Sequence, residues 1–172
     1  KRNTKRTSKS VKESGEDVRK LYGLKEQLEW IKRQIDYANF TESNHLKMAL
    51  KRGEIYEIDW GVNVNAEFSN RHYGVVLRDS QENDPLVLVC PLKSNARGAH
   101  PYSDIDLGYV EALKSDHPTL AVINQIRAMD KVRIYSMNAI GEEDLYKEGK
   151  VPVLEENKLN RIIAGVFNFI LG

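Results

Sequence analysis

Cysteine and long apolar runs are nearly absent from this sequence of 172 residues. The single cysteine, Cys90, lies in a valine-rich run without an accompanying histidine or asparagine pattern, which favours a buried structural thiol over a nucleophile. No apolar run approaches the roughly 18 residues that a membrane helix needs, and no stretch resembles a signal peptide. We therefore expect a protein of the reducing cytoplasm that has no membrane segment.

Metal-ligand spacings are also absent from the sequence. The four histidines, His45, His72, His100 and His117, lack the i, i+3 or i, i+4 spacing of a metal site, and no paired carboxylates frame a loop. We therefore expect neither a metal ion nor another cofactor.

The formal net charge of +1 hides an asymmetry between the two parts of the chain. Residues 1–50 hold 12 Lys/Arg against 7 Asp/Glu, which gives +5, and residues 51–172 hold the remaining 14 against 18, which gives −4. A mildly acidic body is not a broad nucleic-acid-binding surface, which is normally basic. Any nucleic-acid site on the body must therefore gather its positive charge in one groove.

The first 50 residues form an extension with two parts. Residues 1–16 are expected to be a flexible basic tail, because residues 1–12 hold six Lys/Arg and no acid and bury little apolar surface. This tail is either simply solvated or an arm that grips RNA. In residues 17–50, a helix is predicted from Asp17, which can cap it, to Ala38. A second short helix is predicted at residues 43–50.

An apolar seam runs along the first predicted helix. Its side chains recur at alternating spacings of three and four: Leu21, Leu24, Leu28, Ile31, Ile35 and Ala38. The seam covers less than three heptads. It can dock on the body of its own chain, pair with a second copy or receive a partner, and the sequence leaves all three open.

Residues 51–172 have the pattern of a small β domain. Strands are predicted at residues 55–60, 73–78, 86–92, 102–107, 120–124 and 130–135, with a turn at residues 79–85. The third strand is almost continuously apolar, and we expect it to be buried on both faces. A final helix is predicted from about Leu154, with an apolar side of Leu154, Leu159, Ile162, Ile163, Val166, Phe167 and Ile170. This pattern indicates an α+β fold: a strongly curved antiparallel barrel with a terminal helix.

Four motifs in this body follow one another in a recognisable order. They are the basic-Gly-acidic opening at residues 52–60, an Arg before a Val-rich strand at residues 70–77, a Val-rich strand ending in Pro-Leu-x-Ser at residues 86–95, and Gln-Ile-Arg-x-x-Asp at residues 125–130. Together with the apolar segment 161–172, they resemble the MazF/PemK family of endoribonuclease toxins. The resemblance implies an SH3-like barrel and metal-independent, sequence-selective cleavage of single-stranded RNA that leaves a 2′,3′-cyclic phosphate. It also implies a homodimer whose groove is blocked by the cognate antitoxin.

The resemblance places catalysis at the start of the second strand and the end of the third. Arg71 matches the family's catalytic Arg, and its guanidinium suits stabilisation of a pentacoordinate phosphorus. Lys93 stands where many members have a catalytic Thr, so it is expected to bind the scissile phosphate or to act as a base. Ser94 is the alternative source of a hydroxyl, although neighbouring residues on a strand point to opposite faces.

Nucleic-acid binding is expected from residues around the same groove. His72 follows Arg71 and is a candidate acid or base, or else points away from the groove. The loops at residues 61–70 and 95–103 carry Phe68 and Tyr102 as stacking platforms for unpaired bases, and Asn95 and Gln125 complete the expected contacts. The alternative function is a catalytically weak or inactive relative that binds nucleic acid or an antitoxin.

Overall fold

The computed structural model describes residues 4–39, 48–134 and 151–172, and the side chains of the first range from residue 21. The chain divides into two compact units, Lys1–Asn39 and Phe40–Gly172. No helix in the described residues is both long and apolar enough to span a bilayer.

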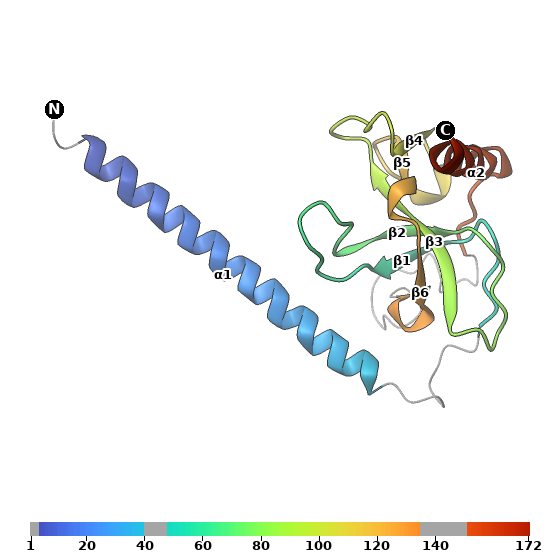
Figure 1. Ribbon diagram of the computed structural model, residues 1–172, viewed down its shortest axis with the longest axis horizontal. Coiled ribbons are helices and arrows are strands. Elements are labelled where there is room, and N and C mark those ends of the chain that lie inside the picture. The colour runs from blue at the N-terminus through green and yellow to red at the C-terminus, as the bar shows by residue number, and fades with distance from the viewer. Residues whose placement is uncertain (1–3, 40–47, 135–150) are drawn as a thin grey trace. The chain divides into compact units, whose positions relative to one another are not determined.

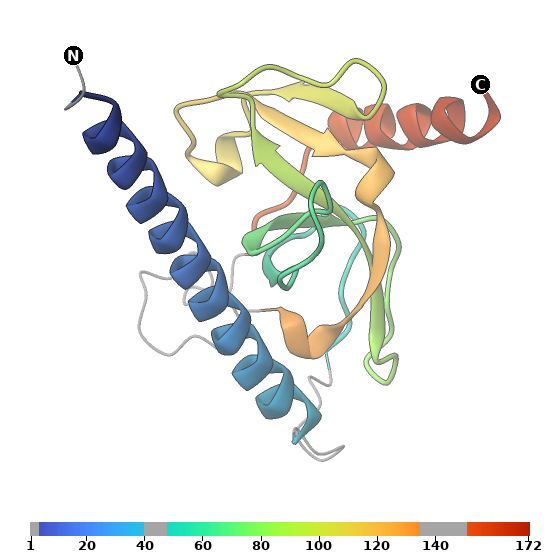
Figure 2. The ribbon, with the colours of Figure 1, turned by 60° about the vertical axis from the view of Figure 1, so that its left-hand side comes forward.

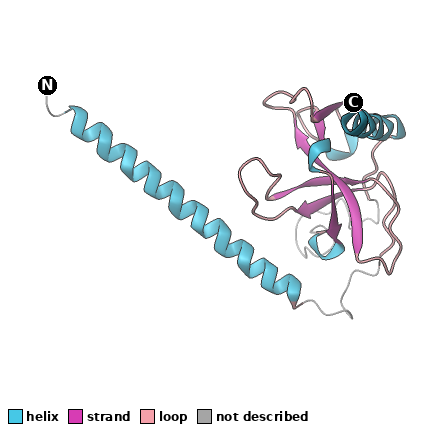
Figure 3. Cartoon of the chain, viewed as in Figure 1, coloured by secondary structure: helices cyan, strands magenta, loops and turns pink. Residues whose placement is uncertain are grey.

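The first unit is a single uninterrupted helix, α1 (Thr4–Ala38) (Figure 3). It includes the helix predicted at residues 17–38 but begins at Thr4, within the segment expected to be a flexible tail. Lys and Arg are good helix formers, and no glycine or proline precedes Gly15, so nothing in the sequence ends the helix at Asp17. Of the second predicted helix, residues 43–47 lie outside the described residues. Its last residue, Leu50, forms an isolated β-bridge with Ser80 instead.

The second unit is an antiparallel sheet of six strands with one terminal helix (Figure 1). The strands and the helix are β1 (Ile55–Asp59), β2 (Arg71–Val76), β3 (Leu86–Ser94), β4 (Asp104–Gly108), β5 (Thr119–Val122), β6 (Arg127–Asp130) and α2 (Glu156–Leu171). The path β1-β2-β3-β5-β4 is completed by β6, which pairs with β3. The predicted antiparallel, SH3-like barrel with a C-terminal helix is confirmed, but the sheet is not closed.

Strand β3 organises the sheet, because one of its edges serves two partners. Its first half pairs with β6 through Leu86 to Val89, and its end pairs with β5 through Leu92 to Ser94. Pro91 lies between these two ladders; it has no N–H to donate, so it fits where the ladder changes partner. Figure 2 shows this long strand passing from one partner to the other.

Three details of the predicted strands are corrected by this arrangement. The third strand is not buried on both faces in its first half, because Leu86 and Leu88 point to a partly open side and are 52% and 39% exposed. The fifth strand stops at Val122 and continues as a 3-10 turn, Ile123–Gln125. The strand predicted at residues 130–135 ends at Asp130, whose carboxylate accepts the N–H of Val132 and starts the 3-10 turn Lys131–Arg133.

The core lies on both faces of the curved sheet. Because side chains alternate along a strand, Ile55 belongs to one buried cluster and its neighbour Tyr56 to the other. Helix α2 adds Leu159 and Ile162 to the cluster of Ile55. On the predicted apolar side of this helix, three residues are exposed, because the helix covers the sheet with only one narrow stripe: Ile163, Phe167 and Ile170.

Candidate functional site

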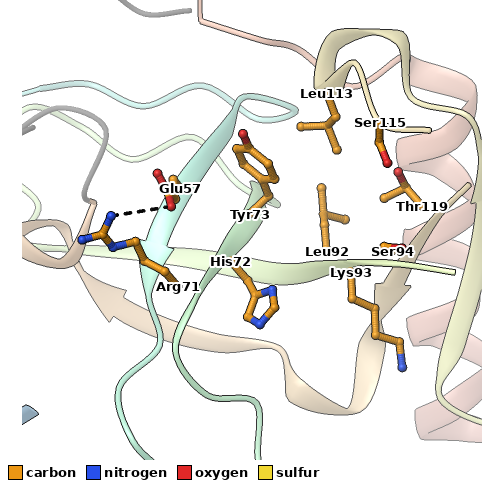
Figure 4. Close-up of a pocket in the computed structure, with 10 residues that line it drawn as sticks. All are labelled: Glu57, Arg71, His72, Tyr73, Leu92, Lys93, Ser94, Leu113, Ser115 and Thr119. Atoms are coloured by element: carbon orange, nitrogen blue, oxygen red, sulfur yellow. Dashed lines mark ion pairs between the residues drawn. The ribbon is translucent and has the colours of Figure 1, made fainter. Parts of the chain in front are cut away.

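A pocket of about 270 Å³ opens where β1, β2 and β3 meet the segment before β5 (Figure 4). Its walls contain three of the expected site residues on two strands, Arg71, Lys93 and Ser94, together with His72. The lining residues are Glu57, Arg71, His72, Tyr73, Leu92, Lys93, Ser94, Leu113, Ser115 and Thr119. The structure therefore brings together residues that the sequence separates widely.

The strand register sorts these residues onto two faces of the sheet. Glu57 lies opposite Tyr73, and Gly74 lies opposite Pro91. Residues that lie opposite each other on neighbouring strands point to the same face of the sheet, and the next residue along each strand points to the other face. Figure 4 shows His72 and Lys93 pointing away from the side that carries Tyr73 and Leu92. The same alternation places Arg71 and Ser94 on the face of Tyr73. Arg71 and Lys93, which were expected to act on one phosphate, thus approach the pocket from opposite faces.

On the first face, Arg71 lies beside Glu57, a carboxylate that was not among the predicted site residues. Nη1 of Arg71 is 4.0 Å from Oε1 of Glu57, and both side chains are partly exposed. The phenol of Tyr73 is half-buried, and this burial, together with the negative charge of Glu57, raises its pKa. Tyr73 therefore keeps its proton at neutral pH. The only sequence signal for Glu57 is its polar position between Tyr56 and Ile58 in an otherwise buried strand.

On the second face, Lys93 forms an ion pair. Its Nζ is 2.8 Å from Oδ2 of Asp104, whose side chain is 1% exposed. The same oxygen accepts the backbone N–H of His100 at 2.7 Å, and Oδ1 of Asp104 has no partner among the described residues. Asp104 belongs to a predicted strand, but only the pairing of β4 with β5, and of β5 with β3, brings it to Lys93.

The rings expected to bind bases are packed against one another. The Phe68 and His72 rings are 4.7 Å apart, and Phe68 meets Trp60 edge-on at 5.2 Å. His72 is exposed overall, and partial desolvation of its ring lowers its pKa below the ordinary value. The backbone N–H of Phe68 donates to Oε1 of Gln125 at 3.2 Å. Three of the four expected binding residues, His72, Phe68 and Gln125, therefore form one cluster.

The remaining expected residues lie at the edges of this region. Asn95 donates its backbone N–H to the Pro118 carbonyl, and its side-chain oxygen is buried without a partner among the described residues. Tyr102 is 79% exposed and free of the core, so it is the more accessible of the two expected stacking platforms. Within the described ranges, no group of histidine, cysteine and acidic side chains could hold a metal ion.

The fold and site define a small, open β-barrel with a polar pocket that combines a guanidinium, a carboxylate and hydroxyls. A family model described as "PemK-like, MazF-like toxin of type II toxin-antitoxin system" matches residues 51–151, more than half of the chain. The chain belongs to this family. Helix α1 lies outside the matched segment.

Solved structures of MazF from Deinococcus radiodurans are similar to the chain at low identity. MazF (Form-I) is 13% identical, covers 72% of this chain and 97% of its own, and has a TM-score of 0.49. A MazE-MazF structure (Form-II) is 14% identical with the same coverage and a TM-score of 0.45. No curated protein matches the chain.

Proposed function

We propose that this toxin-family protein is a metal-independent endoribonuclease that cuts single-stranded RNA at a short sequence motif. The observation that carries the proposal is the arrangement on one face of the pocket, where Arg71 lies 4.0 Å from Glu57 and shares its face with Ser94. Membership of the toxin family supports it. In this proposal the product ends in a 2′,3′-cyclic phosphate, and the protein is a cytoplasmic homodimer.

The reaction needs three catalytic groups: a proton acceptor, a group that stabilises negative charge and a proton donor. The RNA 2′-oxygen attacks the adjacent phosphorus and the bond to the 5′-oxygen breaks, so the 2′-hydroxyl loses a proton and the 5′-oxygen gains one. Glu57 is the carboxylate placed to accept the first proton. Arg71 stabilises the charge that develops on the phosphoryl oxygens. Tyr73, which keeps its proton, and Arg71 are the donors available to the leaving oxygen.

In this proposal Lys93 and Ser94 contact two different phosphates of the RNA. Ser94 shares the face of Arg71 and supplies a hydroxyl to the phosphate. Lys93, held by Asp104 on the other face, binds the next phosphate along the strand as a cation. The cluster of Phe68, His72 and Gln125, with Asn95 and Tyr102 beside it, contacts the flanking bases.

A type II antitoxin is the proposed regulatory partner, since the family is that of type II toxins. An acidic antitoxin segment would compete with RNA for Arg71 and Lys93, because carboxylates and phosphates seek the same cations.

A cleavage assay tests the proposal. Purified protein is incubated with a defined single-stranded RNA in EDTA, and the products are mapped for cyclic phosphate ends. We expect the protein to cleave the RNA and Arg71→Ala to lose this activity. Arg78→Ala is the control and should remain active, because Arg78 is an exposed arginine outside the pocket lining. Cleavage that EDTA abolishes would overturn the mechanism.

One alternative has an observation in its favour. Lys93 is engaged by Asp104, and residues 51–172 carry a formal charge of −4, as expected of a weak or inactive nuclease that binds nucleic acid or an antitoxin. Retardation of the RNA on a native gel without cleavage would identify this function.

A further inference from the structure

Helix α1 carries an apolar seam that no described side chain of its own unit covers. Five side chains of the seam are each at least half exposed: Leu21, Leu24, Leu28, Ile31 and Ile35. They follow the a and d spacing of a coiled coil over consecutive turns. Exposed apolar stripes of this kind mark interaction surfaces.

The residues that flank the seam determine what it can bind. In the heptad that puts Leu21, Leu28 and Ile35 at a, the e positions are Lys25 and Lys32, and the g positions are Lys20, Gln27 and Gln34. Along the seam, from Lys20 to Ala38, no acidic residue stands at an e or g position. The acids of this segment, Glu26, Glu29 and Asp36, fall at f and b, away from a partner helix.

Pairing with a second copy would bring like charges together. In a parallel pair, Lys20 faces Lys25 of the other copy, and in an antiparallel pair Lys25 faces Lys32. Like charges at these positions disfavour self-pairing and select a partner of opposite sign.

From these observations we propose that α1 binds a partner helix that has a Leu/Ile seam flanked by acidic residues. The seam provides the contact area, and the lysines at e and g set the choice of partner. This surface lies outside the family match at residues 51–151, and the proposal does not depend on RNA cleavage.

Two synthetic peptides test the proposal on the full chain. Both have three heptads with Leu and Ile at a and d; one has Glu at e and g, and the other has Lys there. Binding of each labelled peptide is measured by fluorescence anisotropy at about 0.05 M and about 1 M salt. We expect the acidic peptide to bind at least about tenfold more tightly at low salt, with a smaller difference at high salt.

Two variants and the mass of the chain complete the test. Leu28→Asn should weaken binding of the acidic peptide at least about tenfold, whereas Glu26→Gln, at an f position, should not change it. Equal affinity for both peptides would overturn the proposal. It would also be overturned if neither peptide binds, which would mean that the chain's own body covers the seam, or if sedimentation shows a dimer that Leu28→Asn converts to monomer.

Discussion

Nζ of Lys93 lies 2.8 Å from Oδ2 of Asp104, and this pair joins the end of β3 to the start of β4 across β5. The Asp104 side chain is almost completely buried and also accepts the N–H of His100. The carboxylate therefore fixes both a lysine at the pocket and the turn before β4.

Asp104→Asn should lower the free energy of unfolding. The amide oxygen can still accept the His100 N–H, but the charge that compensates Lys93 is lost. We expect the free energy of unfolding to fall by about 1–2 kcal/mol. This is less than for a fully buried ion pair, because Lys93 is partly exposed to solvent. Urea unfolding followed by circular dichroism measures it, with the exposed Asp116→Asn as the control. An unchanged midpoint for Asp104→Asn would show that the pair contributes nothing to stability.

Glu57→Gln should slow RNA cleavage about 100-fold or more without weakening RNA binding, because general-base catalysis is typically worth about 10²–10⁴ in rate. The amide cannot accept the 2′-hydroxyl proton, yet it fills the same space beside Arg71. Single-turnover cleavage and a filter-binding assay separate the two effects, with Glu111→Gln as the exposed control. A variant that cuts RNA at the parent's rate would remove Glu57 from the reaction while leaving the proposed activity in place.

Lys93→Thr distinguishes the two positions proposed to contact the phosphates. Because Lys93 points to the face opposite Arg71, a threonine hydroxyl at this position should not restore the family's mechanism, and cleavage should become slower as a phosphate contact is lost. Ser94→Ala should slow the reaction more, since Ser94 shares the face of Arg71. The rates of both variants are compared under single-turnover conditions. Faster cleavage by Lys93→Thr would assign the hydroxyl role to position 93.

Ionisation of Cys90 should lower the free energy of unfolding in alkaline solution. Burial raises the pKa of its thiol to about 12, and this effect outweighs the backbone hydrogen bond of Val122, which lowers the pKa. In the unfolded chain the thiol ionises near its ordinary pKa of about 9. The stabilisation by the buried, protonated thiol is therefore fully present below pH 9 and is lost as the pH rises from about 9 to about 12. Urea unfolding at pH 7 to 10 should show a decline that is smaller in Cys90→Ala. Iodoacetamide should modify Cys90 only when the protein is unfolded, because the thiol is buried in the folded state.

Replacing two glycines by alanine should change the free energy of unfolding in opposite directions. A Cβ at Gly74 in β2 would lie 2.7 Å from Cδ1 of Ile58 and 3.0 Å from Cζ2 of Trp60, so Gly74→Ala should destabilise the sheet by about 1–3 kcal/mol. A Cβ at Gly23 in α1 would meet nothing within 4 Å, so Gly23→Ala should stabilise the helix by about 0.5–1 kcal/mol. Thermal unfolding and helical circular dichroism report the two effects. Equal stability of Gly74→Ala and the parent would mean that Ile58 and Trp60 move aside at no cost.

The strands were predictable where apolar periodicity was strong and were misplaced where backbone geometry ended them. The spans around Ile55, Val75 and Val89 were predicted well, because each has side chains that must be buried. The strand predicted at residues 130–135 failed because Asp130 caps a 3-10 turn, which apolar periodicity does not reveal. The exposed half of β3 was missed because the same apolar run is compatible with one covered face or two.

By itself, the sequence determined the type of fold, the helical extension with its Leu/Ile seam, and the presence of Arg71, His72, Lys93 and Ser94 around one site. The fold type and the helix follow from local periodicity, whereas the site residues were implied by the resemblance of the motifs to a known family. Only the tertiary structure decided which of those side chains share a face and which charges meet. The pairing of Lys93 with Asp104, and of Arg71 with Glu57, depends on strand register, and register is set by burial across the whole sheet.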